Sequence, residues 1–210
     1  ENRFISRMSR TRLSAEMIRD QSLAVSGLLS AKLGGPPVKP YEVAESFKPM
    51  GRDKGEGLYR SSIYTFWKRT GPAPVMMALD ASKRDVCRVK RERTSTPLQA
   101  LVMLNDPQIN EASRVFGEKI YQKNEGQIGP TIIEMFTNLT SRSPSEKELK
   151  LMESLYNEQR DGFLKDPESA KKYLAVGDSP HDKTIPEENA AALGVLGSAL
   201  FNFWESVAKY

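Results

Sequence analysis

The densest group of chemically active side chains lies between Tyr64 and Asp106, and within it residues 83–93 contain six cations interrupted by two carboxylates. Aromatic side chains, among them Tyr64 and Trp67, stand just upstream. Basic patches interleaved with aromatics hold phosphates and stack bases. The alternative is structural, with Arg91 and Arg93 paired to carboxylates while their stems cover apolar surface. The candidate binding residues of this region are Tyr64, Trp67, Lys68, Arg69, Asp80, Arg91, Glu92, Arg93 and Asn105.

Two carboxylates of this region, Asp80 and Glu92, are of the type that glycoside hydrolases use. Those enzymes divide the acid role and the base or nucleophile role between two carboxyl groups that flank the scissile bond. Here the two residues stand among arginines, where carboxylates more often serve as ion-pair partners. The sequence therefore favours a structural role for both residues and keeps catalysis as an alternative.

The single cysteine and single histidine limit metal and haem chemistry. One cysteine cannot form an internal disulfide, a zinc site built from cysteine pairs, or the C-x-x-C-H motif that attaches haem c. Cys87 stands among cations that favour the thiolate of a nucleophile, but Val86 and Val89 beside it fit a half-buried strand. We therefore expect no metal or haem in this segment and a structural role for Cys87.

Residues 36–95 form an irregular middle segment that is rich in proline and glycine. These residues break long helices. Within the segment, residues 58–67 (LYRSSIYTFW) are rich in aromatic and β-branched side chains, which predicts a strand or an extended stretch. Residues 85–89 are a candidate pairing partner for it. We expect at most a small β element in this segment.

Helical patterns flank the middle segment. An apolar stripe that includes Leu13, Met17 and Leu28 predicts a helix over residues 13–32,. Residues 96–99 (TPLQ) combine an N-cap hydroxyl, a proline at the first helical position and a glutamine that can reach back to the cap amide, so another helix is predicted to start there. Further starts are predicted at Asp106, Gly129-Pro130, Ser143-Pro144-Ser145-Glu146, Asp166-Pro167 and about Glu187, the last helix running to the terminus. The expected fold class is mainly α, a multi-helix domain around an irregular middle.

The triplet Arg91, Glu92 and Arg93 lies just before the helix start at residues 96–99. We predict that it acts chiefly as a scaffold, with the arginines reaching back to Asp80 or Asp85. Removing one partner from a buried ion pair would then cost about 3 to 5 kcal/mol.

Length and composition agree with a water-soluble protein that buries a real core. The chain has 210 residues, 39% of them hydrophobic, and we expect a single domain over residues 1–210. No apolar run approaches the roughly 20 residues needed to cross a bilayer. The net charge of +4 permits anionic partners without demanding them,. Because the chain starts at Glu1 and shows no signal-peptide pattern, we expect an excised segment of a larger protein.

Several stretches together resemble one known family. They are LSAEMIRDQSLAVSGLL, RSSIYTFWKRTGPAPVMMALDAS, VCRVKRERTSTPLQALVMLNDPQ, LTSRSPSEKEL and AAALGVLGSALFNFWE. Over essentially the whole chain the sequence is similar to the planctomycete-type PSD domain, domain-of-unknown-function family 1553. The most specific stretch is residues 91–101 (RERTSTPLQAL).

The resemblance implies a large exported parent protein, periplasmic or on the cell surface, with a cytochrome c-like domain and a second domain of unknown function upstream. It implies haem c only in that other domain. We therefore expect a non-catalytic accessory or interaction module. Its partners would be other domains of the parent, and also a polysaccharide or a second exported protein, with no nucleic acid and no membrane span. The alternatives are an enzyme domain that acts on an extracellular polysaccharide and an anion or nucleic-acid binding module.

Overall fold

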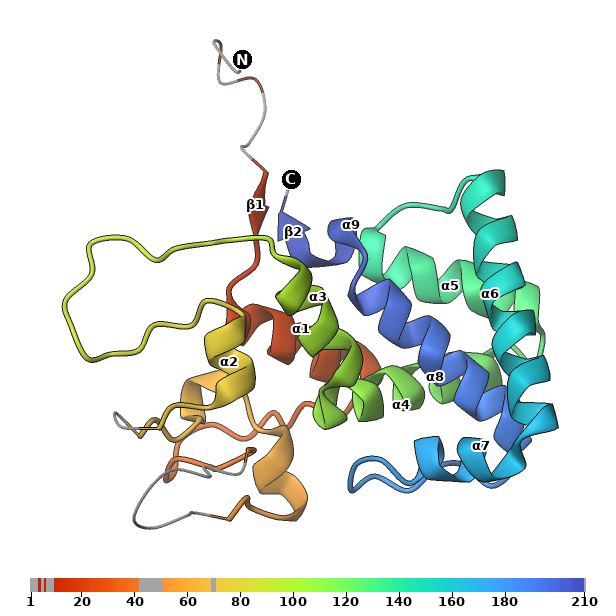
Figure 1. The fold of residues 1–210 in the computed structure, drawn as a ribbon, viewed down its shortest axis with the longest axis horizontal. Helices are drawn as coiled ribbons and strands as arrows, with labels where there is room; N and C mark the ends of the chain where they lie inside the picture. Colours follow the sequence, from red (N-terminus) through yellow and green to blue (C-terminus); the bar gives the residue numbers. More distant parts are fainter. Residues whose placement is uncertain (1–3, 5, 7–9, 42–50, 69–70, 210) are drawn as a thin grey trace. The chain divides into compact units, whose positions relative to one another are not determined.

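The computed structural model describes residues 4, 6, 10–41, 51–68 and 71–209, and 58% of these residues are helical. The prediction of a mainly α fold is confirmed (Figure 1). Within the described part, the one two-stranded sheet pairs β1 (Thr11–Arg12) antiparallel with β2 (Ala208–Lys209). The small β element thus joins two segments far apart in the sequence.

Contacts divide the chain into two compact units. The first contains residues 1–21, 29–102 and 207–210, and the second contains residues 22–28 and 103–206. A compact unit is not necessarily a part that folds independently, so the single domain over residues 1–210 stays a prediction. None of the helices in the described ranges is both long and apolar enough to cross a membrane.

The first helix, α1 (Ala15–Ser26), is shorter than the sequence predicts. It ends at Gly27, whose φ of +85° is the left-handed conformation typical of a residue just beyond a helix,. Its buried positions include Ile18, Arg19 and Leu23, whereas Met17 is 41% exposed. The sequence therefore predicted the wrong buried face for this helix, since the buried face contains Arg19 and leaves Met17 exposed.

The described part of the middle segment is irregular, as predicted, but it contains no strand at residues 58–67. Two short 3-10 helices occupy this stretch, η1 (Gly55–Tyr59) and η2 (Ser62–Tyr64). Isolated parallel bridges join Ser30 to Arg60 and Val38 to Thr65. Residues 85–89 contain bends and pair with nothing as a strand. The short helix α2 (Pro74–Ala78) then precedes a long loop.

Local start signals predict the remaining helices well. The helices are α3 (Pro97–Asn105), α4 (Pro107–Lys123), α5 (Ile128–Thr140), α6 (Glu146–Lys165), α7 (Pro167–Leu174), α8 (Glu187–Phe201) and α9 (Trp204–Val207). The Asp106 side chain accepts a 2.9 Å hydrogen bond from the Ile109 amide, and Ser145 and Glu148 form a capping box at α6. The predicted last helix breaks after Phe201, so α9 and β2 follow α8.

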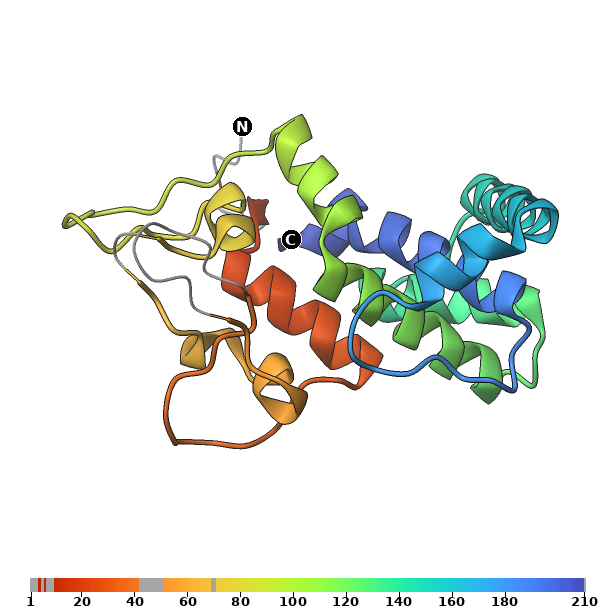
Figure 2. The same ribbon diagram turned by 60° about the horizontal axis from the view of Figure 1, so that its bottom comes forward.

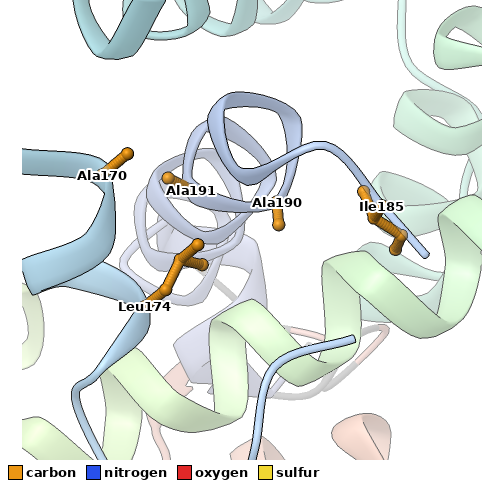
Figure 3. Packing of buried hydrophobic residues seen from close by; sticks show 5 residues of the cluster. All are labelled: Ala170, Leu174, Ile185, Ala190 and Ala191. Carbon is orange, nitrogen blue, oxygen red and sulfur yellow. The ribbon is translucent and has the colours of Figure 1, made fainter. Parts of the chain in front are cut away.

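Helices α4 and α8 make the most extensive helix contact of the second unit (Figures 1 and 2). Glycines permit the close approach of the two helices, because a side chain at these positions would collide with the other helix. A Cβ atom built on Gly197 would lie 2.7 Å from the Ser113 carbonyl oxygen, and one on Gly117 would lie 2.9 Å from the Leu193 Cβ atom. A small apolar cluster extends this core to α7 (Figure 3). It contains Ala170, Leu174, Ile185, Ala190 and Ala191.

Candidate functional site

Asp80 is a hydrogen-bonding centre for Thr94 and Gln99. It follows α2 with a φ of +64°, and its Oδ2 atom accepts bonds from the Thr94 amide at 2.7 Å and the Thr94 hydroxyl at 2.8 Å. The Gln99 side-chain amide donates to the same oxygen at 3.0 Å. The Arg12 guanidinium lies 3.8 Å from it. One carboxylate therefore ties the start of the loop after α2 to the loop's end.

Gln99 connects this centre to the first turn of α3. Its side chain is buried and also donates to the Thr94 hydroxyl at 2.9 Å. Its Oε1 atom accepts from the Thr96 amide at 3.2 Å, and the Gln99 amide donates to the Thr96 hydroxyl at 3.4 Å. The reciprocal cap predicted from residues 96–99 is present. The same glutamine thus caps a helix and holds Asp80.

The environment of Asp80 lowers the pKa of its carboxyl group. Burial works in the opposite direction, but the hydrogen bonds from Thr94 and Gln99 and the positive charge of Arg12 outweigh it,. The carboxylate is therefore ionised at neutral pH, and several donors converge on one of its oxygens. A group with these properties is a poor general acid, because that role requires a raised pKa.

The loop between α2 and α3 extends away from both helices (Figures 1 and 2). Residues 83–98 are all exposed. Arg91 reaches both oxygens of Glu16 at 3.0 Å, and Glu92 pairs with Arg88 at 3.3 Å. The predicted pairing of Arg91 with Asp80 or Asp85 was wrong. Its partner Glu16 lies on α1, where no spacing rule points to it.

Four cations of the loop have no ion pair with any described residue. They are Lys83, Arg84, Lys90 and Arg93. A hollow of about 240 Å³ has Asp80, Lys83, Arg88, Arg91 and Glu92 in its lining. Positive side chains outnumber carboxylates there, so the site has the charge to hold an anionic group.

The other candidate residues occupy different settings. The Tyr64 hydroxyl accepts a bond from the Gly34 amide at 2.8 Å, and the Arg60 guanidinium lies 4.0 Å from its ring centroid. The Trp67 indole N–H donates to the Lys83 carbonyl at 3.0 Å, and Arg84 lies over its ring at 5.1 Å.

The three remaining candidate residues are Lys68, Asn105 and Arg69. Lys68 is partly buried beside Trp67. Asn105 is exposed and ends α3 in the second unit. Arg69 lies outside the described residues. The hollow therefore brings together Asp80, Arg91 and Glu92 of the predicted set, and Trp67 touches its edge through Lys83.

Sequence reasoning missed a second polar network that holds the middle segment. Arg19 is 2% exposed and donates to the Leu58 carbonyl at 2.7 Å, the Arg60 carbonyl at 2.9 Å and the Ser62 hydroxyl at 3.0 Å. Asp20 accepts from the Ser62 amide at 2.8 Å and from the Ser61 hydroxyl at 2.6 Å. The available signal was a charged pair inside the apolar stripe of α1.

Cys87 is exposed, and its neighbours Val86 and Val89 are 61% and 109% exposed. The predicted half-buried strand, and with it the structural role of Cys87, was wrong, because no described strand pairs with the charged loop around Cys87. Among the described residues, no group of three or more His, Cys, Asp or Glu side chains is placed to hold a metal ion.

The comparisons with known proteins give a family. The family model PSD1, described as "Protein of unknown function (DUF1553)", matches residues 1–156. The match includes the Asp80 network, the exposed loop and helices α1 to α5, whereas the resemblance seen in residues 190–205 stays a prediction. No curated protein and no solved structure matches the chain. The chain therefore belongs to the PSD1 family of proteins of unknown function (DUF1553).

Proposed function

We propose that this chain is a non-catalytic interaction module that presents the loop of residues 81–96 to a partner. The observation that carries the proposal is the contrast between the base of the loop and its exposed part. The base is tied by Asp80, Thr94 and Gln99, whereas the exposed part displays cations that form no ion pair with a described residue. Irregular loops longer than roughly 12 to 15 residues are uncommon in compact proteins unless they serve a function.

The same geometry argues against Asp80 and Glu92 as a glycosidase pair. The Asp80 carboxylate is engaged by Thr94 and Gln99, and its lowered pKa keeps it deprotonated. Glu92 is 74% exposed and faces Arg88. A glycosidase acid needs a carboxyl group that holds a proton near working pH. The environment of Asp80 has the opposite effect, because it lowers the pKa of that carboxyl group.

The setting of the module belongs to the same proposal. The resemblance of the sequence supports an exported parent protein, periplasmic or on the cell surface, in which another domain carries haem c. The partners would then be other domains of that parent, a second exported protein or a polysaccharide. The four cations that have no ion pair among the described residues favour an acidic partner surface, because charge complementarity directs association and excludes unsuitable partners.

Charge removal on the loop tests the proposal. In the variant Lys90→Gln/Arg93→Gln the free energy of unfolding should change by no more than about 0.5 kcal/mol, because both side chains are exposed,. Binding to the remaining domains of the parent, measured by calorimetry, should weaken at least about tenfold. The matched control is Lys147→Gln/Lys150→Gln, which removes two exposed lysines from α6 and should leave binding unchanged.

The enzyme alternative has its own measurement. Extracellular polysaccharides would be incubated with the native chain and with Asp80→Asn and Glu92→Gln, and new reducing ends would be counted. The interaction module predicts no turnover by any of the three proteins. If the native chain shows turnover, and if each substitution abolishes it while the protein stays folded, the enzyme hypothesis would replace the proposal.

A further inference from the structure

We infer that the loop and the start of α3 together dock an acidic amphipathic protein segment, which would lay its apolar face on α3 and its carboxylates on the loop. The inference rests on the proposed interaction function and deepens it by naming the class of partner. It depends on three features that lie within the first unit: cations without an ion pair among the described residues, exposed aliphatic side chains close to them in the sequence, and a hollow lined by both kinds of residue.

The cations supply the charge complementarity. Lys90 and Arg93 are exposed and form no ion pair with the described residues. The neighbouring Arg91 and Arg88 are partly neutralised by Glu16 and Glu92. After these ion pairs are formed, the loop therefore keeps positive charge at Lys90 and Arg93. Acidic side chains of a partner would meet these places.

Aliphatic side chains lie beside this charge. Val89 is fully exposed, and Leu98 and Leu101 are 60% and 57% exposed on α3. Residues three positions apart in a helix share a face, so the two leucines form one short apolar stripe that begins directly after the basic loop. Single exposed leucines are ordinary on protein surfaces. A stripe next to unpaired cations has the composition that an amphipathic partner requires.

The loop also provides a concave seat. A hollow of about 860 Å³ is lined by Thr11 and by residues 89–94, so Val89, Lys90 and Arg93 face one depression. Its volume is within the range of roughly 300 to 1,000 Å³ that holds bound groups in proteins. Because apolar and cationic side chains both line it, the hollow suits a protein segment that carries both apolar and acidic side chains.

A protein segment fits these features better than a uniform polyanion. A sulfated polysaccharide or a nucleic acid would use the cations but would leave Leu98 and Leu101 in water. Such ligands also gain from stacking on aromatic rings. The Trp67 side chain already has other contacts, because its ring lies under Arg84 and its N–H donates to the Lys83 carbonyl. Burial of the leucines by a partner would add to the affinity, because it removes apolar surface from water.

The test uses the whole chain with a fluorophore on Cys87, which is exposed and is the single cysteine. The probe is a synthetic amphipathic helix with leucines on one face and glutamates on both flanks. Comparison probes are the same helix with glutamine in place of glutamate, poly-glutamate, dextran sulfate and duplex DNA. Fluorescence titrations at low and physiological salt give the affinities, and those of the acidic helix should fall with salt.

Two double variants separate the apolar and charged contributions. Leu98→Gln/Leu101→Gln keeps good helix formers on α3, and Lys90→Gln/Arg93→Gln removes charge. Each should weaken binding of the acidic helix at least about tenfold. The matched controls Leu151→Gln/Leu164→Gln and Lys147→Gln/Lys150→Gln change equally exposed residues of α6 and should have no effect. Circular dichroism checks that all variants remain helical.

The outcomes distinguish the partner class from the interaction function. If poly-glutamate or dextran sulfate binds as tightly as the acidic helix and the leucine variant has no effect, the surface binds polyanions and the inferred partner class is wrong. The interaction function would stand in that case. If no probe binds, or if charge removal changes no affinity, both the partner class and the use of this loop are rejected.

Discussion

The contact between α4 and α8 and the segment of residues 55–67 are ordered by different means. At the helix contact, Gly117 and Gly197 remove side-chain atoms so that two backbones can approach. In residues 55–67 there is no regular ladder, and Arg19 and Asp20 of α1 supply hydrogen bonds to its backbone and hydroxyl groups. Packing specifies one region and polar side chains specify the other.

This difference affects how each region fails. A buried carbonyl that loses its donor pays the full cost of its lost hydration, whereas a methyl group forced between helices costs strain that the neighbours can partly relax. We therefore expect the largest effects in the polar region.

Arg19→Met should give the largest loss, about 3 to 5 kcal/mol in the free energy of unfolding. Methionine keeps the apolar length of the side chain but leaves the Leu58 and Arg60 carbonyls without their donor. Denaturant unfolding at pH 7 measures the loss. The exposed Arg93→Met is the matched control and should stay within about 0.5 kcal/mol of the native chain. A loss below about 1 kcal/mol for Arg19→Met would show that water replaces the guanidinium.

Gly197→Ala should cost about 1 to 3 kcal/mol, because the new methyl group would meet the Ser113 carbonyl oxygen in the close contact between α4 and α8,. Thermal and denaturant unfolding both measure it. The matched control Gly162→Ala lies in α6, where a Cβ atom meets nothing within 4 Å. That change should stabilise the chain by about 0.5 to 1 kcal/mol, since alanine is the better helix former. Equal signs for the two changes would contradict the packing argument.

The same two regions explain what the sequence could predict. Helix starts depend on residues within four positions of one another, so the caps at Asp106, Ser145 and Asp166 could be read directly. The path of residues 55–67 depends on Arg19, which is far away in the sequence. Its aromatic and β-branched composition suited a strand, but side chains of α1 satisfy its backbone in another conformation.

The candidate site divides in the same way. Gln99 and Thr96 were readable as a cap because their contact is local. The pairing of Arg12 with Asp80 and of Arg91 with Glu16 joins distant segments, and a sequence without structure cannot choose among many available opposite charges. The exposure of residues 83–98 could not be predicted either, because it depends on whether a distant strand pairs with them, and no described strand does.

Asp80→Asn should cost about 1 to 2 kcal/mol at pH 7. The substitution removes the negative charge that faces Arg12, and it removes a strong hydrogen-bond acceptor for Thr94 and Gln99. The folded pKa of Asp80 is lowered, so its contribution is complete above the ordinary value of about 3.9 and is lost as the pH falls through the folded pKa. The difference between native and variant proteins should therefore shrink below about pH 4. Asp85→Asn, exposed in the same loop, is the control. A difference independent of pH would contradict the charge argument.

The smallest effects are expected in the exposed pairs of the loop. Arg91→Ala and Glu92→Gln should each cost about 0 to 1 kcal/mol, the range of surface ion pairs, because Arg91 is 44% exposed and Glu92 is 74% exposed. The sequence suggested a scaffold whose rupture would cost much more, but the structure gives that role to Asp80, Thr94 and Gln99. Denaturant midpoints for the two variants and for Asp80→Asn decide between the assignments. Losses above about 2 kcal/mol for Arg91→Ala or Glu92→Gln would show that the triplet of residues 91–93 is a structural scaffold after all. The contrast between a loop base fixed by hydrogen bonds and an exposed binding loop would then be wrong. Small losses accompanied by weaker binding of the acidic helix would instead extend the docking surface to these residues, because a side chain that contributes little to folding is then free to contribute to recognition.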